Sequence, residues 1–106
     1  MDKLTIEGAL DILSRQDSYV RLLRRDTGDI GLYRPDKTDP QTPHKRDEAY
    51  VIATGTGEFF CDGKMEHFKP GDVFFVAAGV EHRFMNFSED FSTWVIFFGK
   101  TDSGSS

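Results

Sequence analysis

Three side chains in this sequence have the chemistry of divalent-metal ligands: the imidazoles of His44 and His82 and the carboxylate of Glu48. Such ligands suit Fe, Zn, Ni or Mn, so the residue types leave the identity of the metal open. They are also the ligand set of a facial triad, which leaves open positions on Fe(II) for substrate or oxygen. The remaining histidine, His67, lies among polar neighbours just before a tight turn, and we do not expect it to be a ligand.

The spacing of these residues restricts how they can share one ion. His44 and Glu48 would lie about 13 Å apart on a straight strand, at roughly 3.3 Å per residue. The polar residues 45–47 follow Pro43 and would have to bend the chain, and His82 must arrive through the fold. The alternative to a shared site is that the two histidines are unrelated surface residues.

The element expected first along the chain is a short helix in residues 1–17. Apolar residues recur there at helical spacing, and Thr5 can cap the first turn. The apolar positions are Ile6, Ala9, Leu10 and Leu13.

Residues 18–99 have the pattern of an all-β barrel, because short β-type stretches alternate with turns rich in Gly, Asp, Asn and Pro. The expected strands are residues 19–25, 30–34, 48–53, 58–61, 64–68, 73–76, 82–87 and 93–98. At 106 residues the chain is predicted to form one domain, residues 1–106, in which residues 100–106 are a flexible tail.

Composition excludes several classes of partner. The net charge is −5 and no long basic block is present, which argues against binding to nucleic acid or to an anionic membrane. The longest apolar run, residues 73–80, is too short to cross a bilayer. The single cysteine, Cys61, permits no intrachain disulfide, and the N-terminal residues do not resemble a signal peptide, so we expect a cytoplasmic protein.

Two of the expected strands, residues 73–76 and 93–98, are apolar on both faces. In a barrel only one face points inward, so the helix or a second copy must cover the other, and we predict a homodimer. The lumen is expected to hold a small-molecule ligand or substrate in an aromatic pocket. The expected lining residues are Tyr50, Phe75, Phe84, Trp94 and Phe98.

Two stretches resemble the conserved motifs of the cupin superfamily, in order and in spacing. The first is Pro43-His44-Lys45-Arg46-Asp47-Glu48, then six residues and Gly55; the second is Gly71, five residues, Ala77-Ala78-Gly79, two residues, His82, three residues and Asn86. The resemblance covers about residues 33–99 and implies a double-stranded β-helix, or jelly-roll, barrel of the small conserved-barrel cupin type.

The resemblance also implies a metal inside the barrel, held by two histidines that flank one residue, a glutamate and a later histidine. His44, Glu48 and His82 match three of these positions, while Thr42 stands where the first histidine is usual. Gln41, the neighbouring residue, could offer a carboxamide oxygen instead. The metal site is therefore predicted as His44, Glu48, His82 and Gln41.

Two functions remain open. The first is a metal-binding small-molecule cupin whose reaction is undetermined, such as a metal-dependent oxygenase or an isomerase acting in the lumen. The second is a non-catalytic binding or sensing module with a degenerate metal site, and the fold does not choose between them.

Overall fold

A computed structural model describes residues 1–100, so all but the first residue of the expected flexible tail lies outside the described residues. The helix α1 spans Ile6–Leu13. The strands are β1 Tyr19–Arg25, β2 Gly28–Tyr33, β3 Glu48–Thr54, β4 Gly57–Cys61, β5 Lys64–Phe68, β6 Val73–Val76, β7 His82–Met85 and β8 Ser92–Phe98. Every strand expected from the sequence is present, with ends that differ by at most two residues.

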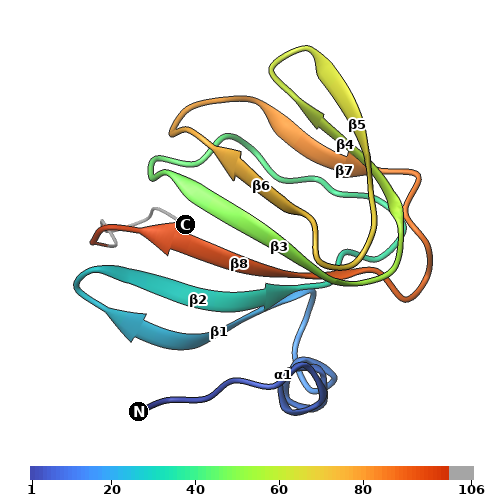
Figure 1. Cartoon of the computed structure of the whole chain (residues 1–106). Coiled ribbons are helices and arrows are strands. Elements are labelled where there is room, and N and C mark those ends of the chain that lie inside the picture. The colour runs from blue at the N-terminus through green and yellow to red at the C-terminus, as the bar shows by residue number, and fades with distance from the viewer. Residues whose placement is uncertain (101–106) are drawn as a thin grey trace.

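The strands form two antiparallel sheets that face each other (Figure 1). The larger sheet has the order β1-β2-β8-β3-β6 and the smaller has the order β5-β4-β7. The central strand β3 pairs with β8, which is distant in sequence, and with β6. This arrangement confirms the predicted all-β jelly-roll fold with a short N-terminal helix.

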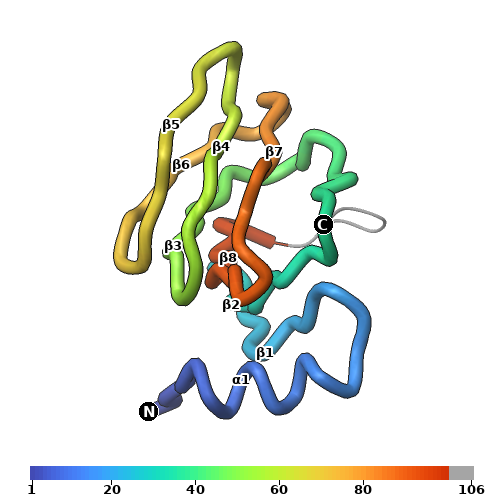
Figure 2. Tube along the Cα trace, turned by 90° about the vertical axis from the view of Figure 1, so that its right-hand side faces the viewer, coloured from blue at the N-terminus to red at the C-terminus, as the bar shows by residue number. Residues whose placement is uncertain are grey.

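Helix α1 begins as its sequence predicts and packs on the outside of the larger sheet. The Thr5 hydroxyl accepts a hydrogen bond from the Gly8 amide at 3.1 Å, as expected of an N-cap. Ala9 and Leu13 are buried against the outer face of β1 and β2 (Figures 1 and 2). Within residues 1–100, no helix is long and apolar enough to span a membrane.

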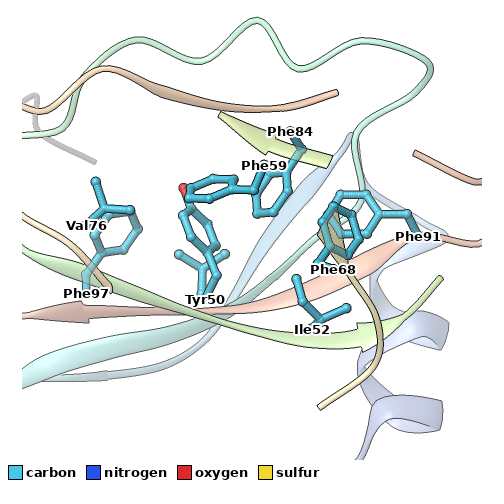
Figure 3. Close-up of a cluster of buried hydrophobic side chains, with 9 residues drawn as sticks. Tyr50, Ile52, Phe59, Phe68, Val76, Phe84, Phe91 and Phe97 are labelled. Carbon is cyan, nitrogen blue, oxygen red and sulfur yellow. The ribbon is translucent and has the colours of Figure 1, made fainter. Parts of the chain in front are cut away.

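The main core lies between the two sheets and is largely aromatic. Figure 3 shows Tyr50 on the larger sheet directed toward Phe59 and Phe84 from the smaller one, and Phe97 beside Val76. The rings of Phe59 and Phe84 are 4.6 Å apart, centroid to centroid. Phe84 and Phe91 are each only 1% exposed. Five buried phenylalanines thus give a small barrel a dense interior, which fixes how the sheets stand relative to each other.

Three of the residues predicted to line the pocket lie instead on the outer face of the larger sheet. In the β3–β8 and β3–β6 registers, Glu48 lies opposite Phe97 and Val76. Since side chains alternate along a strand, Trp94, Phe98 and Phe75 point to the opposite face from Glu48. Phe75 is 62% exposed and Phe98 is 46% exposed, while Trp94 packs on the cluster beneath α1. These three residues do not line the lumen.

Candidate metal centre

The chain bends between His44 and Glu48, as their shared site requires. Residues 45 and 46 form the bend, and the His44 Nε2 atom lies 3.5 Å from Glu48 Oε1. Arg46 holds the bend from the inside: its Nη1 donates to Asp29 Oδ2 at 3.1 Å, and its guanidinium lies over the Phe97 ring. The polar stretch after Pro43 is therefore a fixed corner that brings two distant positions together.

His82 reaches the same point from the smaller sheet. It begins β7 and is 2% exposed. Its Nδ1 lies 2.8 Å from the Val80 carbonyl oxygen, and because a carbonyl only accepts, Nδ1 carries the proton. In the neutral ring the Nε2 lone pair therefore points at Glu48 Oε1, 2.9 Å away. That is the tautomer a metal-binding histidine needs.

Glu48 is the anionic centre of the group and is 1% exposed. Among residues 1–100, neither of its carboxylate oxygens accepts a hydrogen bond. The 2.9 Å contact with His82 becomes a hydrogen bond only when the ring also holds a proton on Nε2. A buried carboxylate without a donor is costly, so this position calls for a cation, either an imidazolium or a metal ion.

Gln41 completes the group where the sequence departs from the usual motif. Thr42 is exposed and Gln41 is half-buried. The carboxamide oxygen of Gln41 lies 2.8 Å from His44 Nε2 and 3.2 Å from His82 Nε2. The Tyr50 hydroxyl also donates to this oxygen, at 3.0 Å. The structure thus brings all four predicted ligand residues together.

Electrostatics in the metal-free site act differently on the two histidines. Burial lowers the pKa of His44 and outweighs the nearby Glu48 carboxylate. Burial also acts to lower the pKa of His82, but its hydrogen bonds to Glu48 and to the Val80 carbonyl raise it above its ordinary value. Burial, with Glu48 close by, raises the pKa of Tyr50 well above its ordinary value. Tyr50 therefore keeps its proton at neutral pH.

The geometry fits one transition-metal ion. The candidate donor atoms of His44, Glu48 and His82 all lie within 4.8 Å of one another. Donor atoms at about 2.1 Å from one ion are themselves separated by roughly 3.0 to 3.4 Å. Gln41 Oε1 and Glu48 Oε1 each lie 2.8 to 3.5 Å from the Nε2 atoms of the two histidines, close to that range. Small shifts of these side chains would bring the four donor atoms onto one ion.

A cavity of about 250 Å³ adjoins the metal group. Its walls are mostly aromatic and aliphatic, with the polar group at one end. The lining residues are Tyr19, Tyr33, Pro40, Gln41, His44, Glu48, Tyr50, Val95 and Phe97. Of the aromatic residues predicted to line a pocket, Tyr50 does so, whereas Phe84 is buried within the core behind it.

The sequence reasoning missed several residues of this site. Val95 and Phe97 were overlooked because β8 is apolar on both faces, so its pattern gives no inward side. Tyr19 and Tyr33 are cross-strand partners on β1 and β2, and they could have been found by pairing the two arms of the predicted hairpin. Asp39, buried beside Gln41, carries no motif and has no comparable signal.

Fold and site together define a class: small antiparallel β-barrels that carry a histidine and carboxylate group beside an interior cavity. The cupin domain family (Cupin_2) matches residues 30–98, and the chain belongs to this family. Over 99 residues it is 33% identical to an uncharacterized protein of Streptomyces coelicolor, covering 92% of this chain and 90% of that one.

Solved structures agree in fold. A cupin-2 domain protein from Shewanella frigidimarina superimposes with a TM-score of 0.72 at 16% identity, covering 88% of this chain and 91% of that one. The structure of KdgF from Halomonas sp. gives a TM-score of 0.69 at 16% identity and covers 80% of each chain. At this level of identity the likeness establishes the fold, and the function must be argued from the site.

Proposed function

We propose that this cupin binds a divalent transition metal through His44, Glu48, His82 and Gln41 and uses the adjoining cavity for a small organic molecule. The observation that carries the proposal is the buried Glu48 carboxylate, which accepts no hydrogen bond among residues 1–100 and faces the Nε2 lone pair of neutral His82 at 2.9 Å. A cation between these atoms removes the cost of bringing them together.

The chemistry available follows from the neighbours of the group. A bound metal ion would supply Lewis acidity and, if it is iron, an oxygen-binding position. The chain itself provides a largely apolar cavity. It also provides the Tyr50 hydroxyl, which can donate a hydrogen bond to Gln41 or His82 at 3.0 Å. A cavity of about 250 Å³ suits a small ligand, because it is slightly smaller than the roughly 300 to 1,000 Å³ that is usual for ligand sites. Such a ligand would present oxygen atoms to the metal and an apolar body to Tyr19, Tyr33 and Val95.

Within this proposal, a metal-dependent oxygenase or isomerase is one form, and a non-catalytic binding or sensing module is the other. Tyr50 favours catalysis, because it places a proton donor at the junction of the cavity and the metal group. The mostly apolar walls serve either role equally well.

Metal content tests the site directly. Untagged protein is analysed for bound elements beside His82→Ala and Glu48→Gln variants. His67→Ala is the matched control, because the His67 side chain is 88% exposed and remote from the group. We expect about one equivalent of metal in the wild type and in the control, and a large loss in the two site variants. Equal metal content in all four proteins, or none in the wild type, would contradict the site.

Turnover separates the two forms of the proposal. Oxygen uptake by the metal-loaded protein is measured with a panel of small thiols, diketones and phenols, and products are analysed for isomerisation. A ligand that raises the melting temperature but is recovered unchanged identifies a binding module. A ligand that is consumed by the wild type and spared by Tyr50→Phe identifies an enzyme in which Tyr50 transfers a proton.

We propose in addition that a second copy of the chain covers part of the outer sheet face. The outward positions of β3, β6 and β8 are apolar except for the buried Ser92, and α1 covers only the side near Trp94. Val73 and Phe75 are each 62% exposed there. These outward positions carry no charge, although the chain as a whole has a net charge of −5. The best partner for an uncharged face is another uncharged face, and a two-fold axis between two copies of the chain would bring two such faces together.

Sedimentation analysis of a Phe75→Ser, Phe98→Ser double variant tests the dimer. Met65→Ser is the control, because Met65 is also exposed, at 44%, but lies on β5 of the other sheet. The wild type and the control should sediment as dimers and the double variant as a monomer. A monomeric wild type would refute the interface.

A further inference from the structure

The segment between β2 and β3 contains a buried carboxylate that no motif predicts. Asp39 is 6% exposed and joins the two sheets through its hydrogen bonds. It accepts from the Tyr33 hydroxyl at the end of β2, at 2.5 Å, and from the Phe84 amide in β7, at 2.8 Å. Figure 2 shows how this segment runs beside β7 before it enters β3. Asp39 is therefore fixed in position by rigid strands on both sides.

The same carboxylate determines which end of the Gln41 side chain faces the metal group. The Nε2 atom of Gln41 lies 2.6 Å from Asp39 Oδ2. A carboxylate can only accept, so the amide nitrogen must be the atom on that side. The carboxamide oxygen is then directed at His44 and His82, at 2.8 and 3.2 Å. A second hydrogen bond, from the Gln41 backbone amide at 3.4 Å, helps to hold the segment.

We propose that Asp39 is a positioning residue that makes Gln41 a metal ligand in place of the imidazole absent at position 42. This inference rests on the proposed metal site. Without Asp39, the Gln41 amide could turn over and present its N–H groups to the cation, or leave the site altogether. Outer partners that orient metal ligands typically change metal affinity by about 10- to 100-fold when they are removed.

Two substitutions at Asp39 should have different effects on the orientation of the Gln41 side chain. In Asp39→Asn, the Phe84 amide still requires an acceptor, so the asparagine oxygen takes the side where it also accepts from Gln41 Nε2. Its amide nitrogen then faces the Tyr33 hydroxyl, which can turn to accept. Asp39→Asn should therefore keep Gln41 oriented, whereas Asp39→Ala should release it.

The test is a Co(II) titration of the metal-free protein, followed by calorimetry and by the visible spectrum of the bound ion. Asp39→Ala and Gln41→Leu should each weaken binding by about 10- to 100-fold and shift the spectrum in the same way. Asp39→Asn should bind nearly as the wild type does. In the Asp39→Ala, Gln41→Leu double variant, the second substitution should add no further loss, because both remove one interaction.

A merely structural role for Asp39 gives a different pattern. The losses in the double variant would then add, or Gln41→Leu would bind Co(II) as the wild type does, and either result overturns the inference. If Asp39→Ala does not fold, Asp39→Ser replaces it, since the smaller side chain leaves room for a water on the Phe84 amide. If neither Asp39 variant folds, the Co(II) affinity of Gln41→Leu still shows whether Gln41 is a metal ligand, and wild-type affinity in that variant overturns the inference.

Failure of this inference differs from failure of the proposed function. If wild-type protein does not bind Co(II), the metal site itself is wrong. If it binds Co(II) and His82→Ala does not, while Gln41→Leu remains unaffected, the metal site stands and only the roles of Gln41 and Asp39 are refuted.

Discussion

The effect of Glu48→Gln on the metal-free protein should change sign with pH. The hydrogen bond to Glu48 helps to raise the pKa of His82 above its ordinary value of 6.5. A raised pKa in the folded state means that this pair contributes stability below the unfolded pKa and loses it as pH rises through the folded pKa. Glu48→Gln removes that contribution, so at about pH 5.5 the variant should unfold more easily than the wild type.

Above the folded pKa of His82 the balance is reversed. The wild type then holds a buried carboxylate, 1% exposed, opposite the lone pair of neutral His82. A glutamine can turn its amide nitrogen toward that lone pair and make a hydrogen bond at nearly the same 2.9 Å separation. Satisfying a buried polar group of this kind is worth about 1–3 kcal/mol. At about pH 8.5 the variant should therefore be the more stable protein, by an amount of this order.

Urea unfolding of the chelator-treated proteins at both pH values measures the effect. The difference in unfolding free energy between variant and wild type should be negative at the lower pH and positive at the higher. A constant difference at the two pH values would show that Glu48 does not act through His82, and would remove the electrostatic argument for the site. His67→Ala, at an exposed position, controls for histidine titration elsewhere.

Three further substitutions test the scaffold. Gly31→Ala should destabilise the protein by about 1–3 kcal/mol and narrow the cavity, because the new Cβ would lie 2.4 Å from the Tyr19 hydroxyl and 2.6 Å from the Val20 carbonyl. Urea unfolding and ligand affinity measure the two effects, and an unchanged unfolding midpoint would contradict this packing. Thr5→Ala should cost about 0.5–2 kcal/mol through the lost N-cap, which Thr5→Ser should largely restore. Phe91→Ala should cost about 3–5 kcal/mol in thermal or urea unfolding, because this ring is 1% exposed; a loss below about 1 kcal/mol would mean that the core is not packed as described.

The strands and most of the metal group could be predicted from the sequence, because the signals for both are local. Alternating apolar residues and turn residues place β1 to β8 to within two residues. The bend at residues 45 and 46 was required by ligand spacing and is present. His82 could be paired with His44 only through the motif resemblance, since His82 begins β7 in the smaller sheet and His44 lies in the segment before β3.

The pocket was predicted less well, because the inward face of a strand depends on its register with its neighbours. Strand β8 has apolar residues on both of its faces. From the sequence alone, Trp94 and Phe98 were therefore as plausible as pocket residues as Val95 and Phe97. The pairing of Glu48 with Phe97 decides the matter, and that pairing joins segments almost fifty residues apart. A shift of one residue exchanges the two faces, which is the physical reason for the error.

A cation site can be distinguished from a vestigial polar cluster by which atoms of Gln41, Glu48 and His82 face one another inside the barrel: electron-pair donors alone, or donors matched with N–H groups. A cluster kept only for packing would be most stable if Gln41 turned its amide nitrogen toward Glu48 and so provided the missing hydrogen bond. The structure does the opposite: Asp39 takes the amide nitrogen at 2.6 Å, and the carboxamide oxygen faces the interior. The Val80 carbonyl likewise takes the Nδ1 proton of His82, which leaves an imidazole lone pair beside the carboxylate. Three kinds of electron-pair donor are thus gathered at one point by partners outside it, and we infer that a positive ion is what they are arranged to receive.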